Sequence, residues 1–195
     1  MRSVRRRYRL RPEDAVLLAA AFLFGAAGLV DRTPRSPTPI SPWQQPNDDA
    51  TPPPTNPVMV ETLDRDTIVL GATKPWPAVI VRYSTSCPHC RSSVEAWREL
   101  SSTSNAVCER GIAVLSLEPL DTQRRFWSDR RWAGAANCET PIVGKPLNSS
   151  AFNLQLPARG VPSHYVLSEA GTTTHVWVGA LRNRRALGQF TDSIP

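Results

Sequence analysis

The chain has 195 residues, four cysteines and a formal net charge of +6. Six of its 23 basic residues are arginines within the first 11 positions, and the other basic residues balance the 17 acidic ones. The part of the chain beyond this cluster is therefore neutral, which excludes a protein that binds nucleic acid through a broad basic surface.

The N-terminal region joins this basic segment, residues 1–14, to an apolar run at residues 15–31. Ala15 to Val30 has no charged side chain, and as a helix at ~1.5 Å per residue it is about 24 Å long, slightly short of the ~30 Å hydrocarbon core. Positive residues before an apolar run hold that end in the cytoplasm and direct the rest outward. We expect a retained transmembrane anchor or a cleaved signal peptide, and the lack of a small-x-small cleavage site favours the anchor. A buried core helix, the third alternative, would need an amphipathic pattern that this run lacks.

The composition changes abruptly at residues 32–57. Nine prolines lie there among Ser, Thr, Asn, Asp and Gln. Such a segment has too little apolar surface to form a core, so we expect a flexible, extended linker. It serves either as a stalk that lets a domain reach its partners or as a passive connection. The remaining residues 58–195 suffice for one domain with one core.

Residues 58–195 alternate between strand and helix patterns. The expected strands are short apolar or alternating runs at residues 59–63, 67–70, 78–83, 111–117, 141–143, 164–168 and 172–178. Short turns join the first two and the last two runs, which predicts two hairpins. One helix is expected to begin at Pro88 and to include Leu100. A second is expected to begin with Asp121 as N-cap and to end near Gly134. A helical turn at 151–156 and a last helix at 184–190 follow. This order predicts an α/β fold with a mixed central sheet flanked by helices.

Two cysteines stand two residues apart, in Cys87-Pro88-His89-Cys90, directly after the apolar run at 78–83. At a strand-to-helix junction the first cysteine lies at the helix N-terminus, where the dipole stabilises a thiolate. The second lies one turn later and can attack a mixed disulfide formed by the first. The spacing therefore predicts a redox-active dithiol.

A structural disulfide and half of a zinc site are the alternatives for this pair. A zinc ribbon requires a second close pair of ligands, whereas Cys108 and Cys138 are thirty residues apart. Haem attachment requires His directly after the second cysteine, and Arg91 is there instead. We therefore expect no metal ion.

The motif, the element order and Gly160-Val161-Pro162 before the last hairpin together resemble the thioredoxin superfamily, and its membrane-anchored TlpA/ResA-like branch in particular. The resemblance covers residues 58–190 and implies a thioredoxin-like fold, preceded by a single transmembrane helix. It implies that Cys87 is the attacking thiol and Cys90 the resolving one. Pro162 is then the cis-proline beside them, and Val161 offers backbone groups to an extended substrate segment.

The implied protein is a thiol–disulfide oxidoreductase on the outer side of a bacterial cytoplasmic membrane, held there by residues 15–31. The resemblance implies protein thiols or disulfides as substrates, a membrane redox partner that resets the dithiol, and no cofactor. A thioredoxin-fold binding or assembly factor with an incidental dithiol is the alternative.

The direction of electron flow is left open by the sequence. Pro88-His89 is the dipeptide of DsbA-type oxidases, and a partly positive imidazole would make the disulfide more oxidising. Pro162 follows Cys90 by 72 positions, which leaves too little room for the helical insertion of those oxidases, so this spacing favours a reductase, including the cytochrome c maturation kind. Ser93 stands where many TlpA/ResA-like proteins have a glutamate that assists proton transfer.

Further expectations concern four single residues. Cys108 and Cys138 each follow a helix that begins at the active-site end of the sheet, so both should lie at the opposite end. They form either a structural disulfide, which suits an oxidising compartment, or two unpaired buried thiols. We expect Arg82 to be partly solvated rather than to place a positive charge near the site, and Trp76 to border the substrate groove.

Overall fold

The computed structural model describes residues 43–44, 57–130, 132, 137–157 and 160–195. The expected basic N-terminus and apolar segment, and all of the expected linker except residues 43–44 and 57, lie outside the described residues. Within the described ranges, no helix is long and apolar enough to cross a membrane.

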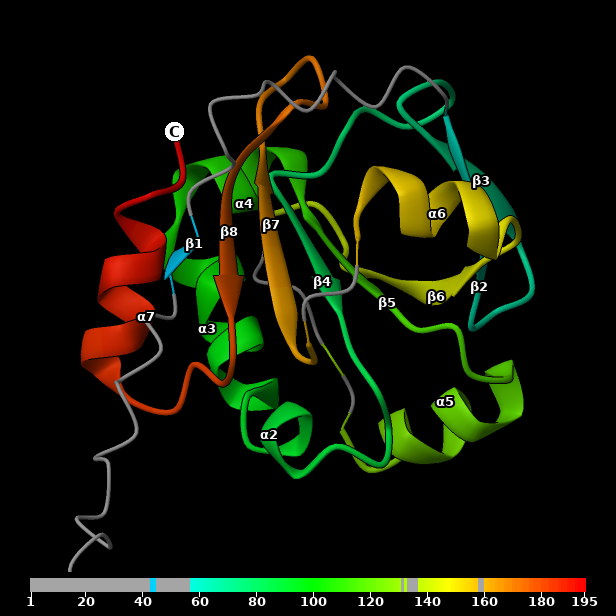
Figure 1. Ribbon diagram of the computed structural model, residues 1–195, viewed down its shortest axis with the longest axis horizontal. Helices are drawn as coiled ribbons and strands as arrows, with labels where there is room; N and C mark the ends of the chain where they lie inside the picture. Colours follow the sequence, from blue (N-terminus) through cyan, green and yellow to red (C-terminus); the bar gives the residue numbers. More distant parts are fainter. Residues whose placement is uncertain (1–42, 45–56, 131, 133–136, 158–159) are drawn as a thin grey trace, which may run out of the picture. The chain divides into compact units, whose positions relative to one another are not determined.

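A mixed sheet forms the centre of the fold (Figure 1). Its strands in the described residues are β1 (Trp43–Gln44), β2 (Val58–Thr62), β3 (Thr67–Leu70), β4 (Val79–Arg82), β5 (Ile112–Leu115), β6 (Ile142–Pro146), β7 (Ser163–Leu167) and β8 (Thr173–Val178). Their order across the sheet is β1-β8-β7-β4-β5-β6-β2-β3. β4, β5 and β6 are parallel, whereas β4 pairs antiparallel with β7. The expected hairpins are β2–β3 and β7–β8, and β1, from the expected linker, pairs with β8.

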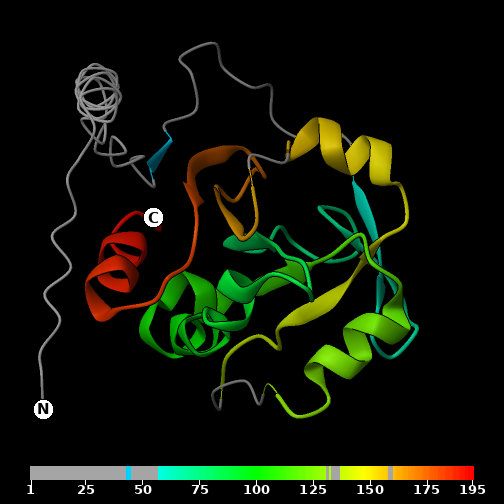
Figure 2. The same ribbon diagram turned by 60° about the horizontal axis from the view of Figure 1, so that its bottom comes forward.

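Helices cover both faces of this sheet (Figure 2). They are α2 (Pro88–Arg91), α3 (Val94–Thr103), α4 (Asn105–Arg110), α5 (Leu120–Trp127), α6 (Ser149–Gln155) and α7 (Arg184–Thr191). Val79 and Val81 of β4 belong to the core cluster that includes residues of α3, α5 and α7, whereas Ile80 belongs to the cluster that includes Phe152 of α6. Since successive strand residues point to opposite faces, a strand covered on both faces must be continuously apolar. This explains why the run at residues 78–81 carries no polar alternation.

The helical region after Pro88 is interrupted, where the sequence indicated one helix. Ser92 and Ser93 separate α2 from α3, and both hydroxyls donate to the carbonyl oxygen of His89, at 3.0 and 2.9 Å. Serine hydroxyls that bond to nearby backbone compete with helical hydrogen bonding. Ser104 then adopts an extended conformation and caps α4 by accepting from the backbone N–H of Val107. The single helix expected from Pro88 is thus two, α2 and α3, and Cys108, expected after that helix, lies within a further short helix, α4.

Helix α5 differs from the expectation at both ends. It begins at Leu120, after Pro119, so Asp121 is not its N-cap; Asp121 lies in the first turn and pairs with Arg124 at 3.2 Å. The helix ends at Trp127 rather than near Gly134. Trp132 packs on Trp127 from outside the helix, with 5.8 Å between ring centroids. The expected extension is wrong because the spacing of the aromatic residues reflects a cluster, not a continuous helix.

Trp76 lies in the core, not beside a substrate groove. It is 8% exposed, and a Cβ added to Gly71 or Gly171 would lie 2.4 or 2.3 Å from its indole ring. Both glycines also have positive φ angles, of 80° and 79°, which other residues rarely adopt. The indole therefore packs against β3 and the β7–β8 turn, because glycine at both positions leaves room for it.

A buried histidine connects α3 to β7. His164 Nε2 accepts a hydrogen bond of 2.9 Å from the indole N–H of Trp97, while its Nδ1 lies 3.4 Å from the carbonyl oxygen of Trp177. Burial lowers the pKa of His164 from 6.5 to about 3, an effect that the bond to Trp177 only partly opposes. The imidazole is therefore neutral in the folded protein at neutral pH.

This lowered pKa predicts that the fold loses stability in mild acid. Below about pH 6.5, His164 binds a proton in the unfolded chain but not in the folded one. The free energy of unfolding is therefore unaffected by His164 above pH 6.5 and falls as the pH is lowered toward 3. We expect the free energy of unfolding to fall by about 2 kcal/mol between about pH 7 and about pH 5 in urea titrations. His164→Gln should lose most of this pH dependence, and the control His175→Gln should keep it. An equal slope in all three proteins would contradict the assignment.

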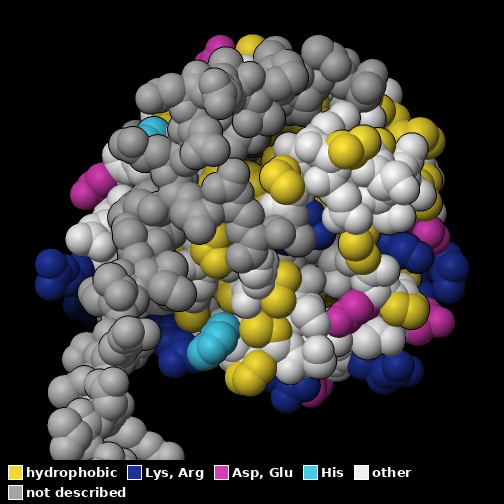
Figure 3. Space-filling model, in the orientation of Figure 1, with side chains coloured by type: hydrophobic (Ala, Val, Ile, Leu, Met, Phe, Trp, Pro, Cys, Tyr) yellow, Lys and Arg dark blue, Asp and Glu magenta, His cyan; other side chains and the backbone are white. Residues whose placement is uncertain are grey.

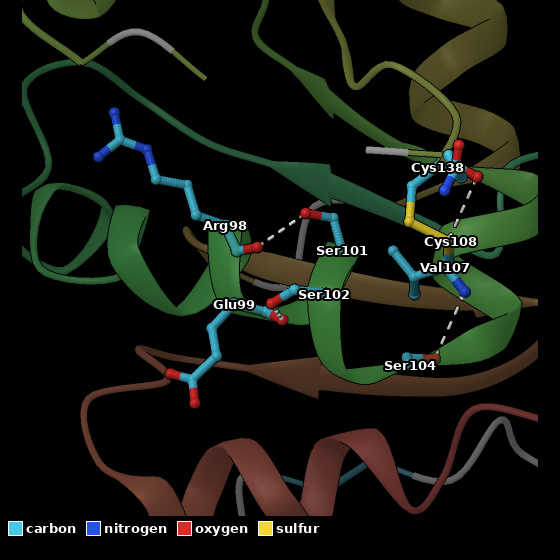
Figure 4. Close-up of a disulfide and its surroundings, with 9 residues drawn as sticks. Arg98, Glu99, Ser101, Ser102, Ser104, Val107, Cys108 and Cys138 are labelled. Atoms are coloured by element: carbon cyan, nitrogen blue, oxygen red, sulfur yellow. Dashed lines mark hydrogen bonds between the residues drawn. A yellow bond between two sulfur atoms is a disulfide. The ribbon is translucent and has the colours of Figure 1, made fainter. Parts of the chain in front are cut away.

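Cys108 and Cys138 form a disulfide with 4.4 Å between their Cα atoms (Figure 4). It joins α4 to the segment before β6, and the backbone N–H of Glu139 donates to the carbonyl oxygen of Cys108 at 2.8 Å. α4 and α2 lie at opposite ends of the domain (Figure 1), as expected from the sequence. By the loop-closure relation, a cross-link between residues 30 positions apart stabilises a fold by about 3.7 kcal/mol.

Candidate active site

Cys87 lies where β4 leaves the sheet and α2 begins. It is the N-cap residue of α2, with Pro88 at the first helical position, where a missing N–H costs nothing. The Cys87 N–H donates to the Ser84 carbonyl oxygen at 3.2 Å, and the Arg91 N–H donates to the Cys87 carbonyl oxygen at 3.2 Å. Both cysteines of the motif are unpaired; Cys87 is half-buried, whereas Cys90 is 0% exposed.

Burial distinguishes the two thiols chemically. The pKa of Cys90 is raised to about 12, chiefly by burial; a backbone hydrogen bond at Ser84 lowers it, and the neighbouring sulfur of Cys87 and the carboxylate of Glu118 add smaller increases. Cys90 is therefore a protonated thiol at neutral pH. Disulfide exchange requires a thiolate, and Cys90 is buried and protonated. Cys87, which is only half-buried, is therefore the sulfur that an outside reagent meets first.

The segment before β7 lies directly beside Cys87. The Cys87 thiol donates to the carbonyl oxygen of Val161 at 3.4 Å, and the Val161–Pro162 peptide bond is cis. Val161 is 39% exposed and Pro162 is buried. The fold thus brings together Cys87, Cys90, Val161 and Pro162, the residues that the sequence resemblance grouped.

His89 is exposed on the outer side of α2. Its Nδ1 contacts the guanidinium of Arg182, from the loop between β8 and α7. The sequence does not indicate this contact, because 93 residues separate Arg182 from His89.

Glu118 is a second residue that sequence reasoning missed. It follows β5, and its carboxylate accepts hydrogen bonds from the Ser84 hydroxyl at 2.6 Å and from the Thr85 N–H at 3.0 Å. Burial raises its pKa, but these hydrogen bonds outweigh that effect and lower it. Glu118 therefore braces the loop that carries Cys87. The available signal was its place after a strand parallel to β4, since such strands end at the same edge.

Arg82 is buried, with 7% exposure, so the expectation of a partly solvated side chain is wrong. Its guanidinium donates to the Leu156 carbonyl oxygen and, at 2.8 Å, to Asn153 Oδ1, and it lies 4.9 Å from the centre of the Phe152 ring. A buried charge is tolerated when its N–H groups are hydrogen-bonded. Arg82 thereby connects β4 to α6.

A small pocket opens next to Val161. It has a volume of about 180 Å³ and lies between the ends of β4 and β5, α6 and the segment before β7, with lining residues that include Leu115, Leu117, Phe152 and Val161. The charged groups at its edge, Arg82 and Glu118, are bonded to the protein itself. The pocket therefore presents mainly apolar surface beside Val161, whose carbonyl oxygen accepts from the Cys87 thiol. Among the described residues, no group of three or more His, Cys, Asp or Glu side chains is arranged to hold a metal ion.

No protein-family model matches the chain, and no curated protein matches it. Solved structures do match it. A DsbF homologue from Corynebacterium diphtheriae is 17% identical, with a TM-score of 0.57 over 80% of this chain and 95% of its own. A thioredoxin-family thiol:disulfide interchange protein from Chlorobium tepidum is 20% identical, with a TM-score of 0.53 over 73% of this chain and 94% of its own. A secreted Mycobacterium tuberculosis disulfide oxidoreductase homologous to E. coli DsbE is 12% identical, with a TM-score of 0.52 over 70% and 92%.

At these identities the likeness shows the fold, not the activity. The chain therefore has a thioredoxin-like α/β fold, and this part of the expectation is confirmed.

The different environments of the two thiols predict selective alkylation. We expect iodoacetamide to label Cys87 of the reduced native protein near neutral pH, and to label Cys90 only after denaturation, because Cys90 is buried and its pKa is about 12. Peptide mass spectrometry measures the two sites separately. Cys87→Ser should resist labelling in the native state; rapid modification of Cys90 in either protein would refute the assignment.

Proposed function

We propose that the protein is a thiol–disulfide oxidoreductase that exchanges disulfides with protein substrates through Cys87 and Cys90. The observation that carries this proposal is the pairing of a half-exposed Cys87 at a helix N-terminus with a fully buried Cys90 one turn later. The solved structures of similar fold include a disulfide oxidoreductase and a thiol:disulfide interchange protein, which supports the same class of reaction.

In the reducing direction, the Cys87 thiolate attacks one sulfur of a substrate disulfide and forms a mixed disulfide, and the other substrate sulfur leaves as a thiolate that takes up a proton. Cys90 then loses its proton and attacks the Cys87 sulfur. This closes the Cys87–Cys90 disulfide and releases the second substrate sulfur as a thiol. Two electrons and two protons pass to the substrate. In the oxidising direction the same steps run in reverse.

The surroundings of Cys87 suit an extended polypeptide as the substrate. Val161 is exposed directly beside the sulfur, at the place where a substrate backbone would lie, and the apolar pocket follows on the side of Leu117. In this proposal Pro162 holds Val161 against the dithiol, and Pro88 starts the helix that presents Cys87. Glu118 keeps the loop before Cys87 in position.

Replacing single cysteines tests the proposal. In the full chain, Cys87→Ser should lower the reduction of insulin by dithiothreitol to the uncatalysed rate. Cys90→Ser should accumulate a mixed disulfide, because its resolving thiol is missing. A chain that has no activity in any form, yet keeps a protein partner when Cys87 is replaced, would instead be a binding or assembly factor with an incidental dithiol.

The reduction potential decides the direction. The short segment between Cys90 and Pro162 favours a reductase, including one of the cytochrome c maturation kind, whereas Pro88-His89 favours an oxidase. Equilibration with glutathione should give a value near about −270 mV for a reductase, or near about −120 mV for an oxidase.

We further propose that the domain works outside the bacterial cytoplasmic membrane, anchored through residues 15–31 and reset by a membrane redox partner. The Cys108–Cys138 disulfide supports an oxidising compartment. In bacteria that produce the full chain, we expect it in the membrane fraction and degraded by protease added to spheroplasts. Recovery in the cytosol would rule out this location, and recovery in the periplasm would mean a cleaved signal peptide.

A further inference from the structure

A positively charged surface lies beside the dithiol. Residues 84–94, which carry Cys87 and Cys90, and residues 179–191, which follow β8, together contain four arginines and no Asp or Glu. We call these four exposed side chains the basic face: Arg91, Arg182, Arg184 and Arg185. Beyond its first 11 positions the chain has equal numbers of basic and acidic residues, so the basic face concentrates positive charge in a chain that is otherwise neutral.

A buried serine holds the two segments of the basic face together. Ser93 is 0% exposed, and its hydroxyl donates to the His89 carbonyl oxygen at 2.9 Å while accepting from the Leu181 N–H at 3.2 Å. Arg182 follows Leu181 in the chain, and its guanidinium contacts the His89 ring. The loop after β8 is therefore fastened to the junction between α2 and α3.

The start of α7 lies at the same end of the domain as α2 (Figure 1). Asn183 caps this helix by accepting from the Ala186 N–H at 2.8 Å, so Arg184 and Arg185 occupy its first turn. Figure 3 shows Lys or Arg side chains beside a His at the lower end of the view, where Figure 1 places α2. The basic face thus extends from α2 to α7.

Acidic side chains of the described residues do not neutralise the α7 end of the basic face. The first acidic residue after α2 is Glu95, and it pairs with Arg98 at 2.7 Å. Arg184 and Arg185 form no ion pair with any side chain in the described ranges. A positive side chain in the first turn of a helix is also unfavourable, because the helix dipole is positive there. The packing of the domain therefore does not explain these two arginines.

The basic face borders Cys87 on the side of α2. The Arg91 N–H donates to the Cys87 carbonyl oxygen at 3.2 Å, and the Arg91 guanidinium donates to the Thr85 carbonyl oxygen at 3.2 Å. On the other side, the small pocket next to Val161 is mainly apolar, and the charged groups at its edge are bonded to the protein itself. A polypeptide that crosses Cys87 beside Val161 thus meets the basic face on one side and an apolar surface on the other.

We propose that the basic face is a docking surface for acidic protein segments, so that the protein acts on disulfides whose cysteines have Asp or Glu nearby. The proposal rests on the proposed function, since the docked segment has to present its sulfur to Cys87. Charge complementarity of this kind speeds encounter and selects partners, although each exposed ion pair adds little affinity. An anionic lipid surface fits the basic face less well, because a bilayer lying across it would cover Cys87.

Three synthetic peptides test the proposal, each closed by one internal disulfide and flanked by Asp, by Ser or by Lys residues. In each turnover the peptide disulfide takes up two electrons and two protons and opens to two thiols, while Cys87 and Cys90 close to a disulfide. Dithiothreitol, the added reductant, returns this disulfide to the dithiol and is itself oxidised to its cyclic disulfide. The rate above that of dithiothreitol alone gives kcat/KM for each peptide.

At low ionic strength we expect the full chain to reduce the Asp peptide faster than the Ser peptide, and the Lys peptide most slowly. The double variant Arg184→Gln/Arg185→Gln should lower the Asp-to-Ser ratio of kcat/KM by about fivefold, the effect of two exposed ion pairs. The control Lys74→Gln/Lys145→Gln removes the same charge from β6 and the segment after β3, and should leave the ratio unchanged. At about 1 M salt the unmodified chain should lose its preference, because the screening length falls to about 3 Å.

Three results would overturn the proposal. The first is equal kcat/KM for the Asp and Ser peptides; the second is an equal fall of their ratio in the control, which would mean that net charge alone acts. The third is inhibition of all three reactions by phosphatidylglycerol vesicles that the double variant escapes, which would assign the basic face to anionic lipid. Failure of the proposed function looks different: the unmodified chain then reduces none of the peptides above the rate of dithiothreitol alone, whatever their charge.

Discussion

Strand β4 lies between a parallel neighbour, β5, and an antiparallel neighbour, β7, and the candidate site depends on this placement. The carboxyl ends of β4 and β5 and the amino end of β7 meet at one edge of the sheet. The chain leads from β4 to Cys87 and from β5 to Glu118, and Val161 and Pro162 come directly before β7. Covering β4 on both faces fixes it in the sheet, so the loop that it releases has a defined direction.

The chemistry of the dithiol comes from a difference in solvation over one helical turn. Cys87, the N-cap residue of the four-residue helix α2, is half-buried, whereas Cys90 within the helix is fully buried. Cys87 stays at the surface beside Val161, while Cys90 is packed in the core with a raised pKa. Such a pair allows an outside sulfur to reach one thiol and protects the other until a mixed disulfide has formed. The short length of α2, set by the Ser92 and Ser93 hydroxyls, leaves Cys90 in the core and the His89 carbonyl available to both serines.

A carboxylate and a guanidinium contact the segments that flank Cys87. Glu118 binds the loop before Cys87, and Arg182 contacts the ring of His89 after it. Each is held by elements distant in the chain: Glu118 by β5, and Arg182 by a loop that the buried Ser93 hydroxyl fastens to α3. The environment of the dithiol is thus a property of the packed sheet and helices, and the Cys-Pro-His-Cys motif supplies only part of it.

The place of Pro162 beside the dithiol was implied by a family resemblance and not by a local pattern. The sequence by itself determined the strands around β4, the helix start at Pro88, and the association of Cys87 with Cys90. These follow from local patterns: a run buried on both faces has to be apolar, and two cysteines one turn apart share a helix end. Only the tertiary structure decided the partners of Glu118 and Arg182, the pairing of Cys108 with Cys138, and the burial of Arg82 and Trp76. The end of α5 also depended on an aromatic cluster with Tyr83, 44 residues from Trp127. Contacts between residues far apart in the chain leave no periodic signal in it, because they depend on how the elements pack and not on the spacing within any one of them.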